Sequence, residues 1–194
     1  MSLNKFQQIR RYLRIAALDI PQTTEEGKRL SYRKVDPMIN QLRSASQAFR
    51  LPSFNNTIDE AMIQCTGCSQ DTYKIPSKPI ELGFKFHCLA DHGYIWDFHP
   101  TSNQTRPDPV PVIQNLTATR GIVIFLASQL PKRRTWHIYL DNFYTSPGLP
   151  LLALLRDRLG ILACGTARPN SKDFPKELAI SKKAVCVTIL LLGS

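Results

Sequence analysis

One short stretch of the chain constrains its fold more than any other. The apolar, β-favouring run from His137 to Leu140 ends in Asp141, and a helix start follows at once. This order places an acid at the carboxyl end of a buried strand, where the sheet of an α/β protein opens toward its ligand. A second acid, Asp59, lies in a similar context far upstream, within residues 57–63. Two strand-borne carboxylates from distant parts of one chain suggest a shared magnesium site.

The spacing of the apolar residues predicts a mixed α/β sheet that follows two helices. We expect strands at residues 57–63, 83–91, 93–98, 136–140 and 160–166, and helices at 116–130 and 146–159 between the later strands. In the N-terminal segment that precedes the sheet, one amphipathic helix has Asn4 as its candidate cap. A second helix begins at Asp36–Pro37. This order matches a ribonuclease H-like fold. Several mixed α/β folds share it, and the placement of the two acids sharpens the match.

The charge of the chain favours a polyanionic partner. Its 25 basic and 15 acidic residues give a net charge of +10, although a simply basic surface is an open alternative. Residues 1–55 alone hold ten Lys or Arg against four acids. The charge marks a basic helical subdomain at 1–55 for DNA binding or dimerisation, and the motif series described below extends the α/β core over 56–178 and leaves a tail at 179–194.

The remaining composition excludes other classes. No run reaches the roughly 18–20 apolar residues that span a bilayer, and the start has no secretory leader, so we expect no membrane contact. Five cysteines, an odd number, indicate free thiols in a reducing, intracellular compartment. The pair Cys65 and Cys68 would need two further ligands to hold zinc, and two unpaired thiols are the default. Nothing indicates a small-molecule substrate.

A series of motifs in a fixed order resembles the piggyBac family of DNA transposases. The resemblance covers roughly residues 3–178 and rests on Lys5–Leu13, Lys34–Pro37, Ile58–Met62, Pro76–Lys85, Tyr139–Ser146, Gly160–Ile161 and Gly165–Asn170. It implies a ribonuclease H-like catalytic core, DNA as the partner, a possible homodimer and a nuclear location. It also implies that Asp59 and Asp141 are the first two catalytic aspartates of a three-aspartate Mg²⁺ site.

The same resemblance makes several basic residues candidates for DNA contacts: Arg10, Arg11, Arg14, Lys78, Lys85 and Arg168. From the residues alone the alternatives stay open. Lys78 and Lys85 fit a solvated strand face as well as a phosphate contact. Asp141 fits a helix cap, and Asp59 fits a surface strand.

The chain also departs from the family pattern. The run from Gln64 to Cys68 lacks the family's arginine, and the resemblance ends after Leu178, before the third aspartate and the cysteine-rich finger. We interpret the tail as out-of-frame or intronic translation, with an ordinary final strand as the alternative. We therefore expect a truncated, catalytically incompetent transposase-derived protein. The alternatives are a non-catalytic, domesticated DNA- or chromatin-binding protein and an inert translated pseudogene.

Two further expectations follow. Asp59 and Asp141 should lie on neighbouring strands with carboxylates about 4–7 Å apart, so that they share a metal. Glu60 should face away from that pair, because successive strand residues alternate sides.

Overall fold

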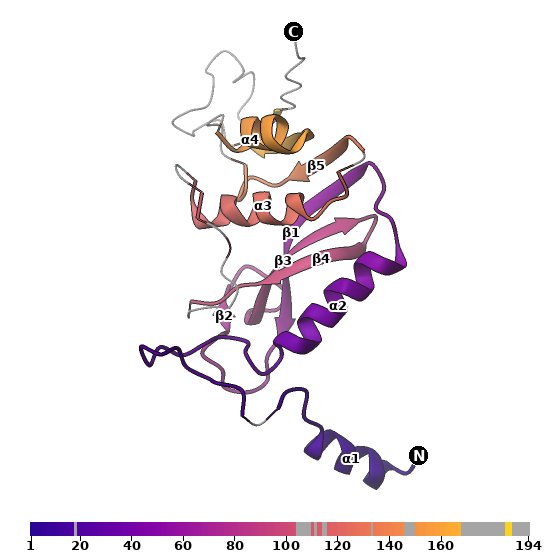
Figure 1. Ribbon diagram of the computed structural model, residues 1–194, viewed down its shortest axis with the longest axis vertical. Coiled ribbons are helices and arrows are strands. Elements are labelled where there is room, and N and C mark those ends of the chain that lie inside the picture. Colours follow the sequence, from indigo (N-terminus) through magenta and orange to yellow (C-terminus); the bar gives the residue numbers. More distant parts are fainter. Residues whose placement is uncertain are drawn as a thin grey trace.

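Seven strands form one mixed sheet in the part of the chain that the computed structural model describes, which is residues 1–17, 19–103, 110, 112–113, 116–132, 134–145, 150–167 and 185–187. The strand order is β2-β3-β1-β5-β6-β7, and β4 also pairs with β3 (Figure 1). The strands are β1 Asn55–Gln64, β2 Tyr73–Lys74, β3 Leu82–Asp91, β4 Tyr94–Pro100, β5 Trp136–Leu140, β6 Ile161–Ala167 and β7 Val185–Val187. The pairs β1–β5 and β5–β6 are parallel, and the other pairs are antiparallel.

The hydrophobic core joins the sheet to the helices α3 (Ala118–Ser128) and α4 (Pro150–Leu159). Ile58 of β1 and Ile138 of β5 are fully buried together with Leu126 of α3 and Leu155 of α4. The alternation along β1 explains this, since Asn56 and Ile58 are buried while their neighbours are exposed. The core therefore ends on β1 at Ile58, one residue before the first candidate acid.

The helix α2 (Asp36–Phe49) is joined to β4 by polar contacts. Arg43 forms a two-point ion pair with the buried Asp97, with Nε–Oδ1 and Nη2–Oδ2 distances of 2.6 and 3.0 Å. The Tyr94 hydroxyl donates to the Ser46 carbonyl at 2.8 Å. These contacts fix the C-terminal half of α2 against the hairpin β3–β4.

The helix α1 (Leu3–Tyr12) has no buried residue and projects away from the sheet (Figure 1). Its cap is Ser2, whose hydroxyl accepts from the Lys5 N–H at 3.4 Å, so the predicted Asn4 cap is wrong. Ser2 is the cap because it directly precedes Leu3, the first helical residue, whereas Asn4 already lies within the helix. The division of the chain at residues 55 and 178 stays a prediction.

The predicted mixed α/β, ribonuclease H-like fold is confirmed, with strand bounds within two residues of those expected. The two-residue strand β2 was not predicted, because it is too short to show a periodicity. Strand β7 is antiparallel to β6 and lies within the tail. Thr117 occupies the N-cap position of α3. Among the described helices, none has the length and apolar character needed to cross a membrane.

Candidate metal centre

The parallel pairing of β1 with β5 brings the two predicted acids together. The last pair in this register is Ile58 with Leu140, and each of these residues is followed directly by an aspartate. Strand β5 ends at Leu140, so Asp141 lies just beyond the sheet while Asp59 lies on the continuing strand β1. Their closest ligand oxygens are within 4.8 Å of each other. The predicted proximity of Asp59 and Asp141 is therefore confirmed.

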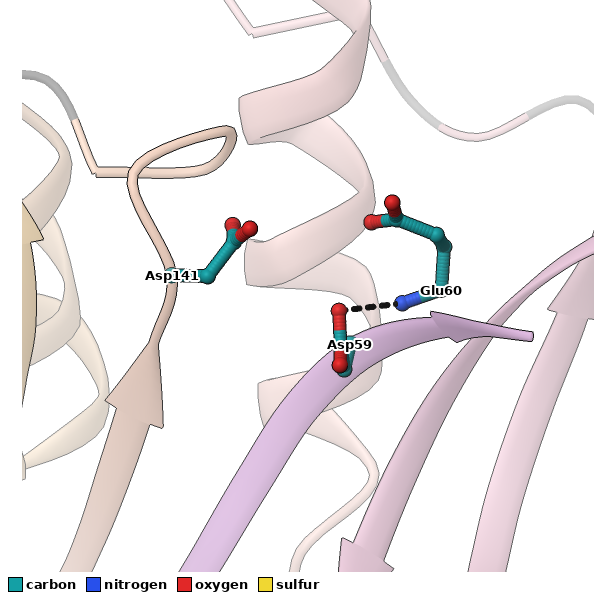
Figure 2. Close-up of side chains that lie close together, drawn as sticks. All are labelled: Asp59, Glu60 and Asp141. Carbon is teal, nitrogen blue, oxygen red and sulfur yellow. Dashed lines mark hydrogen bonds between the residues drawn. The ribbon is translucent and has the colours of Figure 1, made fainter. Parts of the chain in front are cut away.

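A third carboxylate, that of Glu60, belongs to the same cluster. Its ligand oxygen lies within 4.8 Å of those of Asp59 and Asp141, and Figure 2 shows the three side chains around one space. The prediction that Glu60 faces away is wrong. The strand alternation is not broken, because the Asp59 carboxylate bends back and its Oδ1 accepts from the Glu60 N–H at 2.8 Å.

The turn after β5 holds Asp141 in place through short-range hydrogen bonds. Its Oδ1 accepts from the Phe143 N–H at 2.8 Å, and its backbone oxygen accepts from the Thr145 hydroxyl at 2.8 Å. The fully buried Tyr144 anchors the turn, since its hydroxyl lies 2.6 Å from Nδ1 of His87 on β3. Asp141 thus stabilises a local turn while its carboxylate also belongs to the cluster.

Strand β6 approaches the same turn closely at Gly165. A Cβ at this position would overlap the Thr145 hydroxyl and lie 2.9 Å from the Leu140 carbonyl oxygen. Glycine therefore lets the turn pack against β6, and with it the strand end that bears Asp141.

The electrostatics of the cluster reflect crowded negative charge. Burial raises the pKa of Asp59, and the charges of Glu60 and Asp141 raise it further, while the Glu60 N–H and Lys78 oppose the shift. Burial is also the largest influence on Glu60, but the hydrogen bond and charge of Lys78, with Lys85, outweigh it and lower the Glu60 pKa. Two lysines thus relieve part of the repulsion among three carboxylates.

The donor set fits a divalent cation. Carboxylate oxygens are the hard ligands that Mg²⁺ prefers, and a few of them suffice because the ion keeps several waters. Glu60 Oε2 is buried and has no hydrogen-bond partner among the described residues, so this residue of the cluster has an oxygen available for a ligand. Like-charged carboxylates at this distance gain most from a positive ion between them.

Residues 1–187 match a protein family described as transposase IS4. The chain belongs to this transposase family. Among solved structures, the chain is similar to a piggyBac transposase in a synaptic complex with hairpin DNA, with a TM-score of 0.77 and 24% identity. The match covers 94% of this chain and 37% of that chain, so this chain spans well under half the length of the transposase it resembles. No curated protein matches it significantly.

The structural match confirms the resemblance to piggyBac transposases seen in the sequence, and the family itself implies a divalent metal. The family match continues to residue 187, past the point at which the motif series ends.

The predicted basic residues lie in three different settings. Lys78, between β2 and β3, forms an ion pair with Glu60, with an Nζ–Oε1 distance of 2.8 Å, and Lys85 Nζ lies 4.4 Å above the Phe143 ring. Both lysines therefore border the carboxylate cluster. The three candidate arginines of the N-terminal segment are exposed, on α1 or just after it: Arg10, Arg11 and Arg14. Arg168 lies outside the described residues.

Sequence reasoning missed three parts of the site: Glu60 as a member of the cluster, its pairing with Lys78, and the His87–Tyr144 contact under the turn. The available signal for Glu60 was that it is an acid with a longer side chain directly after Asp59. Cys65 and Cys68, the candidate zinc pair, are free thiols.

Proposed function

We propose that this chain is the metal- and DNA-binding core of a piggyBac-type transposase, in which Asp59 and Asp141 hold Mg²⁺ for phosphoryl transfer on DNA. The observation that carries the proposal is the parallel β1–β5 register, which brings both acids to one point in a chain of a transposase family. When bound, the ion would activate the attacking oxygen and stabilise charge on the phosphate. The protein's part is to fix its ligands, which the Asp141 turn does.

Basic residues beside the cluster suit the substrate. Lys78 and Lys85 place two positive charges next to the three carboxylates, where a DNA phosphate would approach the ion. The relative of known structure was solved with hairpin DNA, which supports the same class of partner here. A homodimer and a nuclear location remain part of the proposal by family resemblance.

The exposed arginines of the N-terminal segment would bind DNA phosphates in a way that does not depend on the DNA sequence. Replacing Arg10, Arg11 and Arg14 with Ala should flatten the slope of log affinity against log salt by up to about 3, because each lost phosphate contact releases about one counterion fewer. The matched control removes three exposed charges elsewhere: Lys132, Arg134 and Arg158. An equal effect of the two triple variants would show that only net charge matters.

Catalysis by this polypeptide alone is a separate question, and we expect none. Asp157 is exposed and paired with Arg156 at an Nε–Oδ1 distance of 2.6 Å, so it does not serve the cluster. Asp173 and Glu177 lie outside the described residues. Two ions need more protein ligands at fixed distances than Asp59 and Asp141 provide.

The test is a nicking and strand-transfer assay on a transposon-end duplex with Mg²⁺ and with Mn²⁺. We expect no product in either metal. Product that disappears in Asp141→Asn would show a complete site and would refute the expected incompetence.

The alternative function is DNA or chromatin binding without chemistry, which the exposed basic helix α1 favours. In that case Asp59→Asn and Asp141→Asn should leave DNA affinity unchanged whether or not divalent metal is present. A metal-dependent gain in affinity that both variants abolish would support the transposase core instead.

A further inference from the structure

Glu60 has an unusual position for an acidic residue. Its side chain is only 11% exposed, and one carboxylate oxygen, Oε1, accepts from Lys78. The other oxygen, Oε2, is buried with no hydrogen-bond partner in the described part of the chain. A buried carboxylate oxygen without a partner is costly, so its retention calls for a ligand.

The surroundings of Glu60 indicate what that ligand is. Its nearest acidic neighbours are Asp59 and Asp141, with ligand oxygens within 4.8 Å. On the neighbouring strand β3 its register partner is His87, which is buried and hydrogen-bonded to Tyr144. The space that Glu60 shares with the two aspartates is therefore lined by carboxylate oxygens, which are ligands for a hard divalent cation.

We propose that Glu60 is a third carboxylate ligand of the divalent ion and that Lys78 is the counter-ion that the metal displaces. The inference rests on the proposed function, because it concerns the ion of the same site. A metal ion can displace Lys78 from Glu60, since the Lys78 side chain is 35% exposed and can turn toward solvent. Its ammonium group and a metal ion compete for the same carboxylate, because two positive charges beside it repel each other.

The test is calorimetric titration of the full 194-residue chain with MnCl₂ in the absence of DNA. Glu60→Gln keeps the side chain's shape and removes its charge, and it should weaken Mn²⁺ binding by at least about tenfold. Lys78→Gln should tighten binding severalfold, because the competing cation is gone. The matched control is Glu81→Gln, which removes the same charge from an exposed position just before β3 and should leave the affinity unchanged.

The double variant Glu60→Gln, Lys78→Gln guards against loss of folding, because it removes both charges of the pair and leaves no lone ammonium group. It should unfold at a temperature close to that of the wild type and bind Mn²⁺ as weakly as Glu60→Gln. Wild-type affinity in this double variant would overturn the inference.

The result for Asp59→Asn separates the two claims. If that variant loses Mn²⁺ while Glu60→Gln binds like the wild type, the assignment of Glu60 is overturned and the proposed function stands. If the wild type itself binds no Mn²⁺, the proposed metal site fails as well.

Discussion

His87 makes the stability of this protein depend on pH in a window where few other groups titrate. Its pKa is lowered from 6.5 to about 4, mainly by burial and also by the nearby Lys85 charge, while the Glu60 charge opposes the shift. Between pH 6.5 and about 4 this histidine is protonated in the unfolded chain and neutral in the folded chain. The free energy of unfolding therefore falls as the pH drops from 6.5 to about 4, by about 1.4 kcal/mol for each pH unit and about 3 kcal/mol in all.

The assay is urea unfolding at pH 7, 6, 5 and 4.5, with His87→Asn as the control. An asparagine oxygen can still accept from the Tyr144 hydroxyl, but it does not titrate. The wild type should lose about 2 to 3 kcal/mol between pH 7 and 4.5 beyond the loss in the variant. Other titrating groups contribute equally to both proteins and cancel. Parallel pH profiles for the two proteins would refute a buried, neutral His87.

Three further substitutions test the packing. Arg43→Met should cost about 3–5 kcal/mol in urea unfolding, because it leaves the buried Asp97 carboxylate without its charge partner. Gly165→Ala should displace the Thr145 turn, lowering the free energy of unfolding by about 1–3 kcal/mol and weakening Mn²⁺ binding; unchanged binding would mean that the turn does not position the site. Leu126→Ala should cost about 2–5 kcal/mol, measured by the same unfolding curves, because Leu126 is fully buried.

The sequence was sufficient to predict the strands that carry the two aspartates. Residues 136–140 form a strand with the predicted bounds, because a short apolar run that ends at an acid and a turn leaves few alternatives. The pairing of Ile58 with Leu140 then follows from the parallel register of a ribonuclease H-like sheet. The proximity of Asp59 and Asp141 was predictable because it depends on topology.

The sequence was not sufficient to predict where individual side chains point at the strand end. Glu60 was assigned to the wrong side because alternation gives only the direction in which each side chain leaves the strand, and the Asp59 carboxylate bends back to the Glu60 N–H. The ion pair joins Lys78, in the loop between β2 and β3, to Glu60 on β1, so no local sequence pattern predicts it. The same holds for the bond between His87 and Tyr144, which are 57 residues apart.

The most direct test of the account is the position of a bound metal ion. Crystals of the chain grown with Mn²⁺ should give an anomalous peak about 2.1 Å from carboxylate oxygens of both Asp59 and Asp141, and Asp141→Asn should abolish it. A strong peak at another place, or no peak at saturating Mn²⁺, would contradict the assignment of these residues to a metal centre.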